Sequence, residues 1–61
     1  MMIPKDPHIL LSYINTKLRD EYCDLNDLCL SLNIERSQLE TALSSIEYTY
    51  VKDLNRFTAV M

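Results

Sequence analysis

The chain has 61 residues, a net charge of −3 and an apolar content of 48%. A chain of this length forms one small domain that buries only about 60% of its unfolded surface, which leaves no room for a separate catalytic domain and little for a deep substrate pocket. No segment of the sequence is strongly basic, so the electrostatic attraction that drives nucleic-acid binding is not apparent.

The sequence contains no long apolar segment. No run approaches the ~18–20 residues needed to span a bilayer, and residues 1–12 lack the basic start, apolar run and cleavage site of a signal peptide. We therefore expect a cytoplasmic protein with reduced thiols. Cys23 and Cys29 are the two cysteines, and a disulfide between them is disfavoured because a helix should begin between the two.

The first predicted helix runs from about 7 to 22. Asp6 can cap it, and Pro7 suits the first helical position, where a missing N–H costs nothing. Ile9 and Tyr13 lie toward a second flank of this helix. Apolar residues at helical spacing form the main stripe, which Leu10 widens: Leu11, Ile14, Leu18 and Tyr22.

The second and third helices are predicted at about 25–32 and 36–46. Asp24 is the expected cap of the second helix, and Asn33 should take the left-handed conformation in the turn, with Ile34 as the apolar plug. The inner faces consist of apolar residues: Leu25, Leu28, Cys29 and Leu32, then Leu39, Ala42, Leu43 and Ile46.

A β-hairpin is predicted at about 48–60, where residues alternate with period two. Because the chain contains no glycine, tight turns must use Asn33, Asp53 and Asn55. An isolated hairpin is marginal in water, so its aromatic face should pack on the helices. The residues predicted to be largely buried are Leu11, Ile14, Leu18, Leu28, Cys29, Leu39, Leu43, Tyr48 and Phe57.

These elements predict one domain over 1–61, mostly α with a small hairpin and similar to a winged helix-turn-helix. Four motifs also resemble a family of short bacterial proteins described as a domain of unknown function: Ile3-Pro4-Lys5-Asp6-Pro7, Asn15-Thr16-Lys17-Leu18-Arg19-Asp20, Tyr48-Thr49-Tyr50 and Asn55-Arg56-Phe57. That resemblance implies a stand-alone bacterial protein and supplies no activity, ligand or catalytic residue. Residues 24–60 separately resemble a minimal winged helix-turn-helix of transcription regulators, although residues 35–46 contain one Arg against two Glu.

The chemistry-bearing residues favour structural roles. Cys23 and Cys29 are too far apart for the usual zinc spacing, and Cys29 lies on an apolar stripe. A Cys23–His8 nucleophilic pair would need an orienting group and an oxyanion site, which no motif indicates. The acidic residues from 20 to 27 do not match a calcium loop. We therefore predict no catalytic residue, no cofactor and no metal ligand.

Two surfaces could contact a partner. Tyr48, Tyr50 and Phe57 could stack on single-stranded bases, but core packing explains them better because few basic residues lie near. The apolar residues Met2, Ile3, Ile9 and Tyr13 are a candidate interaction surface. The alternative is that the N-terminal lead folds over its own hairpin, and both interpretations stay open, as does the choice between a monomer and a weak homodimer.

The function predicted from the sequence is a non-enzymatic interaction module that binds an unknown protein partner or itself. The alternative is a small DNA-binding regulator, whose third helix would face the groove of the duplex while the hairpin met phosphate. The DNA contacts in that alternative would be Arg36, Ser37, Gln38, Thr41, Lys52 and Arg56. Folding could also gather several cations on one face: Lys5, Lys17, Arg19 and Arg56.

Overall fold

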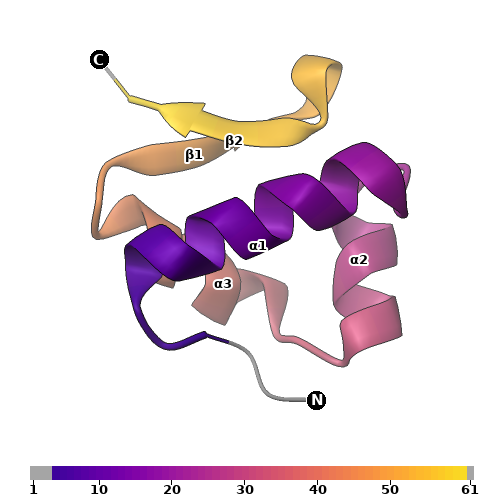
Figure 1. Ribbon diagram of the computed structural model, residues 1–61, viewed down its shortest axis with the longest axis horizontal. Coiled ribbons are helices and arrows are strands. Elements are labelled where there is room, and N and C mark those ends of the chain that lie inside the picture. Colours follow the sequence, from indigo (N-terminus) through magenta and orange to yellow (C-terminus); the bar gives the residue numbers. More distant parts are fainter. Residues whose placement is uncertain (1–3, 61) are drawn as a thin grey trace.

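The computed structural model describes residues 4–60 and consists of three helices followed by an antiparallel hairpin (Figure 1). The elements in chain order are α1 (Pro7–Asp20), α2 (Leu25–Leu32), α3 (Arg36–Ser44), β1 (Tyr48–Val51), a 3₁₀ turn η1 (Lys52–Leu54) and β2 (Arg56–Ala59). The predicted fold of three helices followed by a small hairpin is confirmed, and the likeness to a winged helix-turn-helix stays a prediction. The hairpin lies along one side of α1, and α2 and α3 lie on the other side in this view.

The helices begin where the sequence predicted. The Asp6 carboxylate accepts hydrogen bonds from the backbone N–H groups of His8 and Ile9, at 2.8 and 3.3 Å. The Asp24 carboxylate accepts from the Asp27 N–H at 2.7 Å. Each bond satisfies a donor that has no partner inside the first turn of its helix.

Helices α1 and α3 each end two residues earlier than predicted. At the end of α1 the side-chain amide nitrogen of Asn55 donates hydrogen bonds to the carbonyls of Leu18 and Tyr22, each at 3.1 Å. These bonds satisfy carbonyls at the helix end, so the chain can turn toward α2. At the end of α3 the hydroxyls of Ser44 and Ser45 donate to carbonyls one turn earlier, at 2.8 and 2.6 Å. Side-chain hydrogen bonds of this kind compete with continued helix.

The turns use the three residues that the sequence predicted. Asn33 and Asn55 adopt the left-handed conformation, with φ of 56° and 50°. Asp53 lies inside the 3₁₀ turn η1, which connects the two strands, and Asn55 follows that turn in the left-handed conformation. Glu47, with φ of 64°, is a third left-handed residue that the sequence did not indicate.

The core lies between the three helices and the inner face of the hairpin. Two predictions were wrong: Leu11 and Tyr48 are only half-buried, whereas Leu10 and Leu25 are buried. Leu10 shares the i, i+4 line of Ile14 along α1, and Leu11 is turned about 100° from that line. The buried residues are Leu10, Ile14, Leu18, Leu25, Leu28, Cys29, Leu39, Leu43 and Phe57.

The hairpin register places Tyr50 opposite Phe57 and Tyr48 opposite Ala59. The rings of Tyr50 and Phe57 are tilted against each other, with centroids 5.6 Å apart. This contact joins the two strands, and the hairpin is held on the helices because Phe57 is buried in the core and Tyr50 packs against that core, as a hairpin of this size requires. The longest helix has 14 residues, and no helix within residues 4–60 combines the length and apolar character needed to cross a membrane.

Candidate functional site

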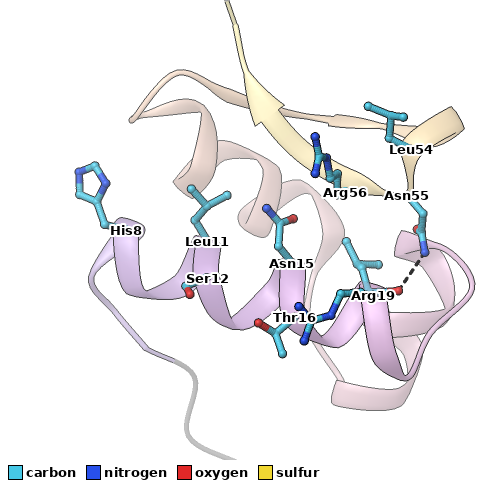
Figure 2. Close-up of a pocket in the computed structure, with 10 residues that line it drawn as sticks. His8, Leu11, Ser12, Asn15, Thr16, Arg19, Leu54, Asn55 and Arg56 are labelled. Atoms are coloured by element: carbon cyan, nitrogen blue, oxygen red, sulfur yellow. Dashed lines mark hydrogen bonds between the residues drawn. The ribbon is translucent and has the colours of Figure 1, made fainter.

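A groove with a volume of 680 Å³ runs between α1 and the end of the hairpin (Figure 2). One wall is a face of α1, and the other comes from the end of η1 and the start of β2. The residues that line it are His8, Leu11, Ser12, Asn15, Thr16, Leu18, Arg19, Leu54, Asn55 and Arg56. The groove is therefore lined by polar side chains along much of its length and by apolar ones at Leu11, Leu18 and Leu54.

Asn15 fixes the two walls of this groove at their midpoint. Its side-chain amide donates to the Phe57 carbonyl at 3.1 Å and accepts from the Phe57 N–H at 2.8 Å. The pair of bonds is the exchange that a neighbouring strand would make at the edge of a sheet. Helix α1 thus takes the place of a third strand beside β2.

Asn55 joins the same two walls at the C-terminal end of α1. Its amide nitrogen donates to the carbonyls of Leu18 and Tyr22, and its oxygen accepts from the Tyr50 hydroxyl at 2.7 Å. That hydroxyl also accepts from the Leu25 N–H at 3.3 Å. One side chain in the hairpin therefore connects the end of α1, the start of α2 and strand β1. No side-chain N or O atom that is buried among residues 4–60 lacks a hydrogen-bond partner.

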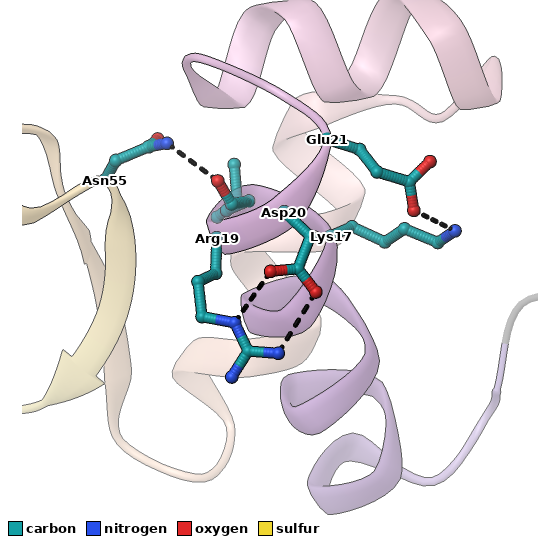
Figure 3. Close-up of polar contacts among 6 residues, drawn as sticks. Lys17, Arg19, Asp20, Glu21 and Asn55 are labelled. Carbon is teal, nitrogen blue, oxygen red and sulfur yellow. Dashed lines mark hydrogen bonds and ion pairs between the residues drawn. The ribbon is translucent and has the colours of Figure 1, made fainter.

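Two guanidinium groups open onto the groove, from Arg19 on α1 and Arg56 on β2. Arg19 forms two hydrogen bonds with Asp20, at 2.9 and 3.0 Å (Figure 3). This pairing raises the pKa of Arg19 and lowers the pKa of Asp20, chiefly through the hydrogen bonds, and both side chains are mostly exposed. Arg56 is exposed, and its guanidinium makes no hydrogen bond or ion pair within residues 4–60.

The hydroxyls of Ser12 and Thr16 also have no hydrogen-bond partner within residues 4–60. Both residues are exposed on the groove face of α1. By contrast, the hydroxyls of Ser44 and Ser45 at the end of α3 donate hydrogen bonds to backbone carbonyls. The groove therefore presents donors and acceptors that remain available to a ligand.

The interaction surface predicted from the sequence is only partly placed. Met2 and Ile3 lie outside the described residues. Ile9 is 59% exposed on the first turns of α1. Tyr13 is half-buried against the core, and the Lys17 ammonium lies 5.7 Å from the centre of its ring.

The predicted gathering of cations is found only for one pair. Arg19 and Arg56 line one groove, whereas the Lys17 ammonium lies over Tyr13 and bonds Glu21 at 2.6 Å. This bond with Glu21 is the main cause that raises the pKa of Lys17. Lys5 is exposed and does not line the groove.

The residues predicted to contact DNA do not form one surface with uniform chemistry. The Arg36 guanidinium bonds the Asn26 side chain at 2.7 Å and Glu40 at 3.4 Å, and it lies 5.7 Å from the centre of the Tyr50 ring. The remaining predicted contacts are all exposed: Ser37, Gln38, Thr41, Lys52 and Arg56. Arg36, the cation of α3, is thus held by its own chain, and contact with DNA stays a prediction.

The two cysteines lie in different surroundings. Cys29 is a buried free thiol, as predicted, and its pKa is raised chiefly by burial, with a smaller rise from Glu40 and a lowering by Arg36. Cys23 is an exposed free thiol whose sulfur lies 4.0 and 3.9 Å from carboxylate oxygens of Asp24 and Asp27. Within residues 4–60 no three His, Cys, Asp or Glu residues are grouped to hold a metal ion.

Asn15 and Asn55 stand in two of the motifs that carry the family resemblance, and Asn55 was also predicted as a turn residue, but no contact was predicted for either side chain. An asparagine in mid-helix is a weak signal, because its side chain favours caps and turns over helix interiors. Nothing in the sequence says which backbone groups such a side chain will reach 42 positions away.

Comparison with known proteins gives one match. No curated protein and no solved structure matches the chain. The family described as "Domain of unknown function (DUF4250)" matches residues 4–57. Because this match covers most of the 61 residues, the chain belongs to the DUF4250 family.

Proposed function

We propose that the protein is a non-enzymatic interaction module that binds a protein partner in the groove between α1 and the hairpin. The observation that carries the proposal is the state of the polar groups in that groove. The side chains of Asn15 and Asn55 hold the walls together, whereas the side chains of Arg56, Ser12 and Thr16 are exposed and make no hydrogen bond in the described chain.

The walls of the groove are well suited to a macromolecular contact. They are joined by bonds between α1 and β2 and between the hairpin and the end of α1, so little ordering entropy is lost when a partner binds. Leu54, which is 57% exposed, offers an apolar contact beside the polar groups. A mixture of apolar area and available donors is typical of protein interfaces.

Catalysis is less well supported by the same residues. His8, in the first turn of α1, is the one histidine among the residues that line the groove. A general base needs a partner that orients it and a reacting group within hydrogen-bond reach. No hydrogen bond of the His8 ring is found within residues 4–60.

The test is affinity capture from the native cell with a groove variant and a matched control. Thr16→Trp fills the groove, and Thr41→Trp places the same bulk on an exposed threonine of α3. We expect the wild type and Thr41→Trp to retain the same protein and Thr16→Trp to lose it, with all three showing equal melting temperatures. Equal retention by Thr16→Trp, or retention of no protein by the wild type, would refute the proposal.

A further inference from the structure

The inference concerns the chemistry of the partner, and it rests on the proposed function. We infer that the groove binds an acidic, extended segment of the partner protein, with carboxylates at Arg19 and Arg56 and an apolar side chain at Leu54. Four observations support this assignment: the availability of the two guanidiniums, the distribution of charge, the length of the groove and its apolar end.

The two guanidiniums can both accept a carboxylate. The Arg56 guanidinium has no hydrogen-bond or ion-pair partner within residues 4–60. Arg19 is paired with its neighbour Asp20, but the two side chains are 74% and 51% exposed, so exchanging one carboxylate for another costs little. A guanidinium binds a carboxylate through two parallel N–H···O bonds, which favours this anion over a neutral ligand.

Charge is distributed unevenly over the fold, although the chain is acidic as a whole. Residues 7–20 and 48–59, which contain both walls of the groove, hold four cations (Lys17, Arg19, Lys52 and Arg56) and two acids (Asp20 and Asp53). Residues 21–47 hold six acids and a single cation, Arg36. An acidic segment is therefore attracted to the layer formed by α1 and the hairpin and repelled from α2 and α3.

The groove has the length of a short extended peptide. Its α1 wall reaches from His8 to Arg19, which at 1.5 Å per residue corresponds to ~16 Å. An extended chain advances ~3.3 Å per residue, so about five residues fit along this wall. Leu11 and Leu54 lie toward opposite ends of the groove (Figure 2), and the exposed Leu54 offers a contact for one apolar side chain of the segment.

Nucleic acid fits these observations less well. Binding to a phosphate backbone gains affinity from several cations that follow the strand. The groove has two guanidiniums, and the six acids of residues 21–47 oppose a longer polyanion. A short segment with a few carboxylates needs only the local pair.

The test uses a fluorescein-labelled peptide of glutamate and leucine, and a matched peptide in which glutamine replaces every glutamate. Fluorescence anisotropy should show binding of the glutamate peptide that weakens with salt, and no comparable binding of the glutamine peptide. Arg56→Gln should weaken the binding about tenfold, as expected for losing a charged hydrogen-bonding partner. Lys52→Gln makes the same change of charge outside the groove and should leave the affinity within about twofold, since an exposed charge contributes little.

Several outcomes would overturn the inference. Equal binding of the two peptides, equal effects of Arg56→Gln and Lys52→Gln, or tighter binding of a labelled single-stranded DNA would each do so. A sedimenting mass that approaches a dimer and returns to a monomer in Arg56→Gln would place a second copy in the groove instead. If the captured protein is lost with Thr16→Trp but retained by Arg56→Gln, the proposed function stands and the acidic segment does not.

Discussion

The side-chain amide of Asn15 is paired with the backbone of Phe57 through two hydrogen bonds, although the two residues are 42 positions apart. Phe57 is 2% exposed, so its N–H and C=O groups have little access to water. A buried backbone group without a partner costs free energy comparable to a lost hydrogen bond. Asn15 therefore completes the edge of β2 and positions α1 against the hairpin.

Asn15→Asp is predicted to destabilise the fold by about 1–3 kcal/mol at neutral pH, the cost of an unsatisfied buried polar group. The carboxylate can still accept from the Phe57 N–H, but its second oxygen faces the Phe57 carbonyl. Thr16→Asp adds the same charge at the next, exposed position and should change stability by less than about 0.5 kcal/mol. Urea denaturation of both variants measures the difference, and equal losses would contradict the role of the Asn15 amide.

Asn55→Gly is predicted to destabilise far more than Asn33→Gly. Both residues have φ near 50°, which glycine adopts without strain. The Asn33 side chain makes no hydrogen bond in the described chain, whereas that of Asn55 makes three. Asn33→Gly should therefore change stability by less than about 1 kcal/mol, and Asn55→Gly should cost at least about 2 kcal/mol. Thermal melts followed by circular dichroism compare the two, and similar melting temperatures would refute the network.

Local signals in the sequence predicted the elements of the fold correctly. Asp6 and Asp24 are caps that act within three residues of themselves, so their roles follow from sequence alone. The left-handed Asn33 follows in the same way from the lack of glycine and the need for a turn.

The candidate site could not be predicted because it depends on contacts between distant segments. Arg19 and Arg56 share a groove only because Asn15 and Asn55 hold the hairpin beside α1. Charge counted along the chain shows an acidic protein, and the grouping of cations appears only when 7–20 and 48–59 lie in one layer. Leu11 was predicted as core for the same reason, because the sequence does not show that it borders a groove.

Glu47→Gly is predicted to stabilise the protein by about 0.5–1 kcal/mol. The left-handed conformation of Glu47 costs a residue with a Cβ roughly 1–2 kcal/mol, and glycine avoids this cost. Part of the stabilisation is offset because glycine has more conformational freedom to lose when the chain folds. Glu47→Gln removes the charge but keeps the Cβ, so it should leave stability unchanged within about 0.5 kcal/mol. Urea midpoints for the two variants give the comparison, and stabilisation by Glu47→Gln would show that charge rather than backbone strain is responsible.

Binding to random duplex DNA at ~150 mM salt is predicted to be undetectable at micromolar protein. The chain carries a net charge of −3, and Arg36 is held by Asn26 and Glu40. Fluorescence anisotropy with a labelled duplex tests this prediction. The variant Glu40→Gln is included because it removes the negative charge that pairs with Arg36 on α3. A submicromolar complex with a steep salt dependence, weakened by Gln38→Ala, would favour the DNA-binding alternative.

Cys29 is predicted to make the folded protein less stable as the pH becomes alkaline. Burial raises the pKa of its thiol in the folded state, so the unfolded chain loses its proton first as the pH rises. The resulting stabilisation is complete below the unfolded pKa of about 8.5 and is lost as the pH rises from there toward the folded pKa. The free energy of unfolding, measured in urea from neutral to alkaline pH, should therefore fall more steeply for the wild type than for Cys29→Ala. Cys23→Ala keeps Cys29 and should keep the wild-type slope, and a slope unchanged by Cys29→Ala would contradict the prediction.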